Sequence, residues 1–181
     1  VSNLGLVTGV AAGTVTITYT DNNGCSTTET VTVNALPAAP TTSNIAYCQD
    51  ETATALSATA LTGHTLVWYD TDATTVLASA PTPTTTTAGN TTYYAAQSND
   101  NTGCEGAQAS ITVTVNPTPT ISGTTSVCVD ATTTLTGSGT AATTSPWASS
   151  DDDVATVSNL GLVTGVAAGT VTITYTDNNG C

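Results

Sequence analysis

Two stretches of this chain are identical over 25 residues. Residues 1–25 and residues 157–181 both read VSNLGLVTGVAAGTVTITYTDNNGC, so position 1 recurs at position 157, an offset of 156 residues. A fold tolerates many apolar substitutions of similar volume, and structure alone therefore does not demand such identity. The identity indicates duplication of a gene segment. We interpret the chain as part of a tandem array with a 156-residue period.

The composition excludes several kinds of partner. The 181 residues include no Lys or Arg and 13 Asp and Glu, which gives a formal net charge of −13. Nucleic acids and anionic membrane surfaces are bound through basic side chains, so we expect neither as a partner. No apolar run approaches the length of about 18 residues that membrane insertion needs. Without Lys, isopeptide cross-links between Lys and Asn cannot form, and any covalent reinforcement must come from cysteine.

The sequence predicts an all-β fold. Thr and Val favour strands, and apolar and polar side chains alternate along Gly13–Thr20. The segment DNNG at residues 21–24 predicts a hairpin turn, and Thr27–Val33 is the expected return strand. Residues 1–10 are expected to form a short extended pair around residues 3–5. No segment has the periodicity of a helix.

Three parts are predicted along the chain. Residues 1–36 are interpreted as the C-terminal part of a module from the preceding period, residues 37–116 as a complete module, and residues 117–181 as the N-terminal part of the next module of the first type. Residues 26–36 then show the strand that completes this module type. Pro-containing linkers separate the parts. Seven strand candidates in the middle part favour an antiparallel β-sandwich: Thr41–Tyr47, Thr52–Thr59, Thr65–Asp70, Thr74–Ser79, Thr84–Ala88, Thr91–Ser98 and Ala109–Val115.

Longer sequence patterns carry two family resemblances. The segments YCQDETATAL, LVWYD, APTPTTTTAGNTTYYAAQSN and GCEGAQASITVTV lie in residues 37–116, which resemble the Ig-like modules of large surface proteins of gliding bacteria. The segment PWASSDDDVATVSNLGLVTGVAAGTVTITY makes residues 117–181 resemble a bacterial Ig-like group 2 domain. The resemblance implies tandem immunoglobulin-like β-sandwiches that serve as spacers or adhesive stalks in extracellular proteins. Core and turn residues define such families, so they indicate fold more firmly than function.

The cysteines follow the same period. Cys25 and Cys181 are equivalent positions, so a complete period holds four cysteines. Each module has one early cysteine, Cys48 or Cys128, and one in its last hairpin, Cys104 or Cys181. An even set of cysteines in an apparently secreted chain favours disulfides over free thiols and over metal binding.

Two disulfide pairings compete. Cys48–Cys104 and Cys128–Cys181 would form within modules. In the Ig-like topology, however, the turn after the first strand and the last hairpin lie a strand length apart, roughly 20 Å, while bridged Cα atoms lie within about 7 Å. We therefore favour bonds between successive modules, with Cys48–Cys181 in this chain and Cys25, Cys104 and Cys128 joined to equivalent cysteines of neighbouring periods. An irregular first strand would instead allow pairing within modules.

The sequence contains no strong signal for a catalytic site or a metal site. His64 is the only histidine and is expected in a turn, and no catalytic motif is present, so we expect no enzyme. Asp151, Asp152 and Asp153 form the densest cluster of charge and are candidate calcium ligands. Their consecutive spacing lacks the alternation of a calcium-binding loop, and a solvated loop is the favoured interpretation. We expect no cofactor, and calcium is the one candidate ligand.

The two tryptophans bear on carbohydrate binding. Trp68 and Trp147 follow the early cysteine of each module at nearly the same spacing, which favours a core position on the third strand. The alternative is an exposed aromatic platform for a glycan. The sequence as a whole favours a disulfide-reinforced structural repeat unit of a long extracellular bacterial fibre or adhesin stalk at the cell surface, whose partners are neighbouring repeats, head to tail. The alternatives are a carbohydrate- or calcium-dependent adhesive module and a spacer in a large secreted hydrolase.

Overall fold

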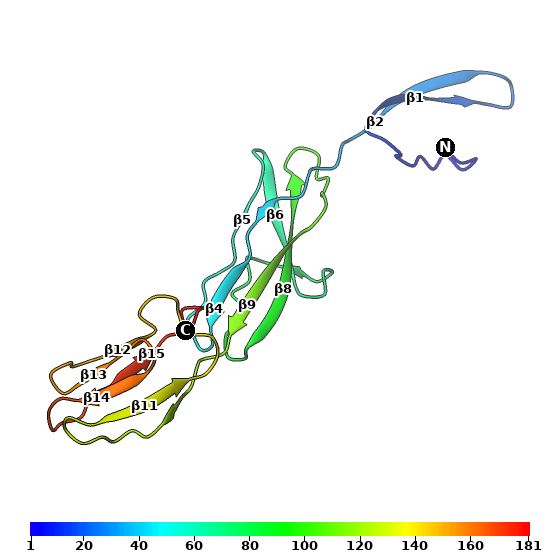
Figure 1. The fold of residues 1–181 in the computed structure, drawn as a ribbon. Helices are drawn as coiled ribbons and strands as arrows, with labels where there is room; N and C mark the ends of the chain where they lie inside the picture. The colour runs from blue at the N-terminus through cyan, green and yellow to red at the C-terminus, as the bar shows by residue number, and fades with distance from the viewer. The chain divides into compact units, whose positions relative to one another are not determined.

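The computed structural model describes residues 1–181 and consists of β-strands, turns and loops without any helix (Figure 1). The all-β prediction is therefore confirmed. Since the chain forms no long apolar helix, it offers no candidate for a transmembrane helix.

The chain divides into two compact units, and each is described by itself. The first unit comprises Val1–Ser43, Ala55–Pro81 and Thr92–Thr112, and the second comprises Asn44–Thr54, Thr82–Thr91 and Val113–Cys181. Residues 37–116 contribute to both units. The predicted boundaries were drawn from the repeat in the sequence, whereas the two compact units are defined by contacts in space. The boundaries therefore stay a prediction.

A long hairpin follows the first ten residues. Strands β1 (Gly13–Thr20) and β2 (Ser26–Val33) pair antiparallel along their whole length, from Gly13 opposite Val33 to Thr20 opposite Ser26. Both predicted strands are confirmed, the return strand beginning one residue earlier than expected. The expected extended pair in residues 1–10 is wrong. These residues form a turn closed by the N–H of Gly5 on the carbonyl of Ser2 at 3.0 Å, and no strand.

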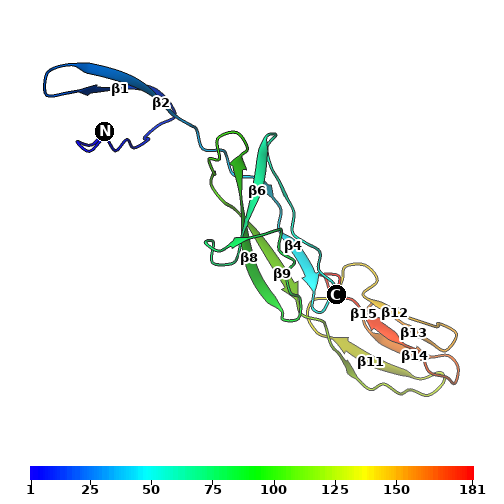
Figure 2. The same cartoon turned by 180° about the vertical axis from the view of Figure 1, so that it is seen from behind.

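Residues 41–116 contain seven strands, although not the seven that were predicted. A five-stranded sheet has the order β4-β9-β8-β6-β7, and β8 and β9 run side by side in the views of Figure 1 and Figure 2. Strands β3 and β5 form a separate pair. The bounds are β3 (Thr41–Thr42), β4 (Ile45–Cys48), β5 (Ala58–Thr59), β6 (His64–Tyr69), β7 (Val76–Leu77), β8 (Gly89–Asn99) and β9 (Ala109–Asn116).

Two expectations for this region need correction. Strand β4 runs parallel to β9, with Ile45 opposite Val113 and Cys48 opposite Asn116, so the pairing is not purely antiparallel. The predicted strand Thr84–Ala88 does not form. Backbone carbonyls in this segment accept hydrogen bonds from the turn after β4 instead of from a neighbouring strand.

Residues 117–181 form two further sheets of the second unit. The first has the order β10-β11-β14-β13, and the other pairs β12 with β15. The bounds are β10 (Ile121–Gly123), β11 (Thr132–Gly137), β12 (Trp147–Ser149), β13 (Ala155–Val157), β14 (Leu162–Gly165) and β15 (Ile173–Tyr175).

Both tryptophans are core residues, as the matching positions predicted. Trp147 is buried with Leu135, Ala155, Val163 and Tyr175. Its ring lies 4.7 Å from that of Tyr175, centroid to centroid, at an interplanar angle of 47°. Such tilted aromatic pairs contribute beyond the area that they bury. Trp68 on β6 is also buried, so neither indole is exposed as a glycan platform.

Candidate functional site

The turn that follows β4 presents Cys48. The carbonyl of Cys48 accepts the N–H of Glu51 at 3.1 Å, and the Glu51 carboxylate accepts the N–H of Cys48 at 2.8 Å. Between them Asp50 has a φ of 64°, in the left-handed region, which Asp tolerates better than most residues. These reciprocal bonds fix the direction of the backbone at Cys48.

A loop from further along the chain holds this turn in place. The carbonyl of Thr85 accepts the N–H of Asp50 at 3.0 Å, and the Thr85 hydroxyl donates to the carbonyl of Glu51 at 2.6 Å. The Gln49 side-chain amide donates to the carbonyl of Thr86 at 3.0 Å. Thr85 is itself buried. Three hydrogen bonds therefore join the turn to residues 85–86.

The turn after β15 presents Cys181. Asp177 Oδ1 accepts the N–H groups of Asn179 and Cys181, both at 2.9 Å, while the N–H of Asp177 donates to the carbonyl of Cys181 at 2.9 Å. Burial of Asp177 opposes ionisation. The N–H donors of Cys181, Asn179 and Gly180 outweigh it, however, and hold the pKa of the carboxyl below its usual value. Asx turns of this kind are encoded locally.

The two turns meet in a disulfide. Cys48 and Cys181 are bonded, with their Cα atoms 5.5 Å apart and a sequence separation of 133. This separation lies within the range for unstrained bridges. Both cysteines belong to the second compact unit. The structure thus joins the early cysteine of one segment to the hairpin cysteine of the next.

Strand register explains why Cys48 has this partner instead of Cys104. Cys48 lies opposite Asn116, the last residue of β9, whereas the turn that carries Cys104 precedes Ala109, the first residue of the same strand. Eight strand residues span roughly 25 Å, well beyond the reach of a disulfide.

The remaining cysteines are free. Cys25 and Cys128 are exposed, and Cys104 is half-buried. The N–H of Cys104 contacts the hydroxyl of Thr102 at 3.4 Å, and Gly103 beside it has a φ of 68°, so this cysteine also lies in a tight turn. Their pairing with equivalent cysteines of neighbouring periods stays a prediction.

The other candidate residues are not brought together. His64 is the first residue of β6 and not in a turn, and its ring nitrogens contact the carbonyl of Thr62 and the side-chain amide of Asn99. Asp151, Asp152 and Asp153 are exposed, and Asp151 Oδ1 accepts the N–H of Asp153 at 3.0 Å.

No group of three or more His, Cys, Asp or Glu side chains is placed to hold a metal ion. Calcium binding at residues 151–153 therefore has no support from the geometry and stays a prediction.

The sequence did not predict the hydrogen bonds that join residues 85–86 to the Cys48 turn. The segment APTPTTTTAG, residues 80–89, was interpreted as containing a strand. Its prolines, Pro81 and Pro83, were the available signal, because proline removes the donor that a ladder needs.

Two family models match adjacent parts of the chain, and both describe Ig-like domains. Residues 37–117 match the family model of the Ig-like domain described as CHU_C associated. Residues 109–181 match the model of the bacterial Ig-like domain, group 2. Adjacent parts of the chain are therefore similar to Ig-like domains of these two families, as the resemblances indicated. No curated protein matches the chain.

Proposed function

We propose that this chain is a structural repeat unit of a long extracellular fibre or adhesin stalk, in which disulfides link each Ig-like domain to the next. Ig-like domains of bacterial surface proteins are structural modules and generally not catalysts, which supports the class of function. An extracellular location is compatible with the disulfide.

The observation that carries the proposal is the position of the Cys48–Cys181 bond. Cys48 belongs to the segment that matches the CHU_C-associated family, and Cys181 belongs to the segment that matches group 2. A bond between two different domains resists their separation in a way that a bond within one domain does not. With no Lys or Arg in the chain, cysteine is the available covalent link.

The identical stretches extend this link to an array. Cys25 occupies in residues 1–25 the position that Cys181 occupies in residues 157–181. A cysteine equivalent to Cys48 in a preceding period is its partner in the array. Cys104 and Cys128 are available for the corresponding bonds at the other junction type. Each period would then carry two covalent junctions, and the length of the fibre would increase linearly with the number of repeats.

Single-molecule pulling from residues 1 and 181 tests whether the Cys48–Cys181 bond carries load. Cys48 and Cys181 are 133 positions apart in the sequence, and the residues between them lie inside a closed loop, so the oxidised chain should not release their contour length. Reduction should release roughly 450 Å more at about 3.4 Å per residue. Cys25→Ser is the control and should leave both traces unchanged. Equal extension before and after reduction would contradict a load-bearing bond.

Electron microscopy of the native material tests the fibre itself. Threads with a repeat on the order of 60–80 Å are expected if two sandwiches of roughly 30–40 Å lie end to end in each period. Non-reducing peptide mapping of the same material should recover a peptide that joins Cys48 to the hairpin cysteine of the following domain. Recovery of Cys48–Cys104 alone would overturn the stapled array.

The carbohydrate-binding and spacer alternatives have less support. Both indoles are buried, which leaves no tryptophan platform for a sugar. A spacer role in a secreted hydrolase uses the same fold and differs only in the domain that it carries.

A further inference from the structure

The segment from Cys25 to Cys48 consists mostly of strand. These cysteines are 23 positions apart, and the residues between them form β2, the linker, β3 and most of β4. A strand advances about 3.3 Å per residue, which is close to the limit of about 3.6 Å for a fully stretched chain. In the linker, Pro37 and Pro40 disfavour helical backbone in the residues that precede them. The segment therefore has little length in reserve that tension could release.

The linker in this segment is held by β8 and the turn after it. Gln97 on β8 is fully buried, and its side-chain amide donates to the carbonyl of Ala38 at 2.8 Å. Gly106 leaves room for the linker, because a Cβ at this position would overlap the carbonyl oxygen of Pro37. Pro40 is itself buried. These contacts fix the course of the linker, so it does not act as a loose spacer.

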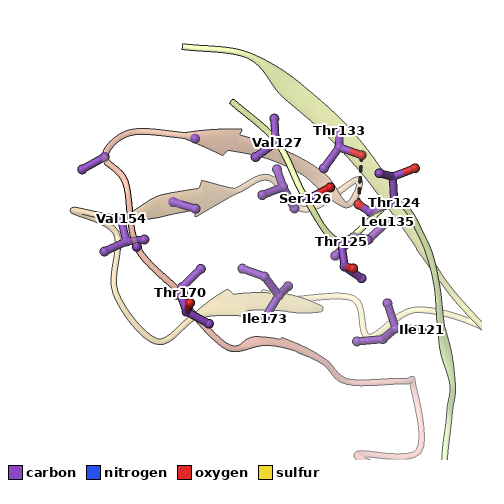
Figure 3. Close-up of a pocket in the computed structure, with 16 residues that line it drawn as sticks. Ile121, Thr124, Thr125, Ser126, Val127, Thr133, Leu135, Val154, Thr170 and Ile173 are labelled. Carbon is purple, nitrogen blue, oxygen red and sulfur yellow. Dashed lines mark hydrogen bonds between the residues drawn. The ribbon is translucent and has the colours of Figure 1, made fainter. Parts of the chain in front are cut away.

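A second segment of the same kind runs from Cys104 to Cys128. It spans 24 positions and contains β9, the second linker and β10. Beyond β10 the hydroxyl of Thr133 donates to the carbonyl of Thr124 at 3.1 Å, which ties this part of the segment to β11 (Figure 3). The second segment therefore also lies against neighbouring strands along its course.

The two segments begin and end in equivalent turns. Asp50 and Asp130, two residues beyond the final cysteine of each segment, have φ angles of 64° and 61°. The carbonyl of each final cysteine accepts the N–H of the residue three positions further on at 3.1 Å. At the start, the first N–H of each hairpin turn donates to the carbonyl of the hairpin cysteine, at 2.9 Å for Cys25 and 3.0 Å for Cys104. Both segments thus present their two cysteines in the same way.

The two segments run side by side where β4 pairs with β9. This pairing is parallel, with Ile45 opposite Val113 and Cys48 opposite Asn116. Both segments are therefore followed in the same direction from the hairpin cysteine to the early cysteine. Hydrogen bonds between paired strands run across the strand direction. Tension along either strand would load these bonds together instead of one at a time, which gives the parallel pairing a mechanical role.

We propose that residues 25–48 and residues 104–128 are two tension paths of the fibre, and that the disulfides let force bypass the rest of each domain. This inference rests on the proposed function, because it requires bonds between cysteines of successive periods. The first tension path runs from Cys25 to Cys48 and crosses the disulfide to Cys181, which is the equivalent of Cys25 in the next period. The second tension path continues in the same way through the bonds of Cys104 and Cys128.

The length of a tension path agrees with the length expected for a period. Its 23 positions extend to roughly 80 Å at about 3.4 Å per residue, and two sandwiches end to end span on the order of 60–80 Å. Without disulfides, the 156 residues of a period would extend to roughly 530 Å. The oxidised fibre should therefore hardly lengthen under load, even where the bypassed strands and loops of a domain unfold.

Optical tweezers applied to this chain test the first tension path without an array. One handle is attached by a thioether to Cys25 in a variant with Cys104→Ser and Cys128→Ser, and the other to a C-terminal tag. With the Cys48–Cys181 bond intact, the chain should lengthen by less than about 20 Å once low force has aligned its parts, because strand backbone is already close to full extension. Reduction should raise the maximum extension to roughly 530 Å.

Moving the first handle to Cys104, in a variant with Cys25→Ser and Cys128→Ser, gives the matched control. The shortest covalent route from Cys104 to the C-terminus then leads back over 56 positions to Cys48, and these residues lie outside the first tension path. The oxidised control should therefore unfold in steps to a total extension of roughly 190 Å. The same bond and the same C-terminal handle serve both measurements, so only the point of attachment differs.

Two failures can be told apart. If the oxidised chain held at Cys25 lengthens by more than about 50 Å, the path is slack, and this inference is overturned while the bonds between periods stand. If peptide mapping of native material finds no bond between successive periods, the proposed function fails and the inference fails with it, whatever the single chain shows. Native oxidised fibres should rupture without stepwise lengthening, and steps should appear only after reduction.

Discussion

Tyr19 and Tyr175 hold the same position in two identical 25-residue stretches, yet Tyr19 is 67% exposed and Tyr175 is 8% exposed. The same contrast holds for Val7, which is 37% exposed, and Val163, which is 5% exposed. Because the sequences are identical, no property of the residues themselves produces these differences. The comparison separates what neighbours along the chain decide from what packing partners decide.

The turns are alike in both copies. Ser2 Oγ accepts the N–H of Leu6 at 3.1 Å, and Ser158 Oγ accepts that of Leu162 at 3.2 Å. Asp21 Oδ1 accepts the N–H of Cys25 at 2.8 Å, as Asp177 does from Cys181. These bonds join residues within four positions of one another, so they form wherever the segment is placed.

The strands differ. In the second copy residues 162–165 form β14 between β11 and β13, whereas residues 6–9 form no strand. In the first copy β1 extends over eight residues against β2, whereas β15 covers three against β12. A strand needs a partner for its backbone, and the available partner determines both its length and the side chains that it buries.

The largest expected difference between the copies concerns the two tyrosines. Tyr175→Ala removes the ring that packs on Trp147 and should lower the free energy of unfolding by about 3–5 kcal/mol. Tyr19→Ala removes an exposed ring and should change it by no more than about 0.5 kcal/mol. Urea denaturation followed by tryptophan fluorescence measures both. Equal losses would mean that the two copies have the same environment in solution.

The next difference concerns the two hairpin cysteines. Cys181→Ser opens the closed loop to Cys48 and should lower the free energy of unfolding by about 2–4 kcal/mol. Cys25→Ser changes an exposed free thiol and should have no measurable effect. Thermal denaturation without reductant compares the two variants. A stabilisation by Cys25 as large as that by Cys181 would show that Cys25 has a disulfide partner of its own.

The smallest effect is a pH dependence that both copies should share. The N–H of Cys25, ahead of those of Asn23 and Gly24, lowers the pKa of Asp21, and equivalent donors lower that of Asp177. A carboxyl whose pKa is lower in the folded chain stabilises it above the unfolded value of about 3.9. That contribution is lost as the pH falls through the lower, folded pKa.

Carboxyl chemical shifts in an NMR titration measure this dependence directly. Both aspartates should titrate below the unfolded value, and Asp21→Asn and Asp177→Asn should make the acid loss of stability shallower. A lowered pKa at Asp177 alone would mean that the turn depends on packing and not on its own sequence.

Much of the fold could be predicted because it is encoded over short distances. Alternation along Gly13–Thr20 and the DNNG turn predicted β1, the hairpin and the return strand, since each depends on residues adjacent in the chain. The spacing of Trp68 and Trp147 from the early cysteines predicted core positions, because each lies at a similar place in its Ig-like domain.

The errors arise where distant segments compete for backbone groups. Residues 84–88 have the composition of a strand, but their carbonyls are bonded to the turn at Cys48. The parallel pairing of β4 with β9 joins residues 68 positions apart, and no local pattern distinguishes it from an antiparallel one.

The sequence by itself thus determined the turns, the all-β fold class and the turns in which the cysteines lie. Each of these depends on hydrogen bonds and side-chain alternation within a few residues. Only the tertiary structure decided which tyrosine is buried and which cysteine reaches Cys48. Those outcomes depend on surfaces contributed by remote segments. Two identical 25-residue stretches therefore differ in burial, strand length and bonding while they share every turn.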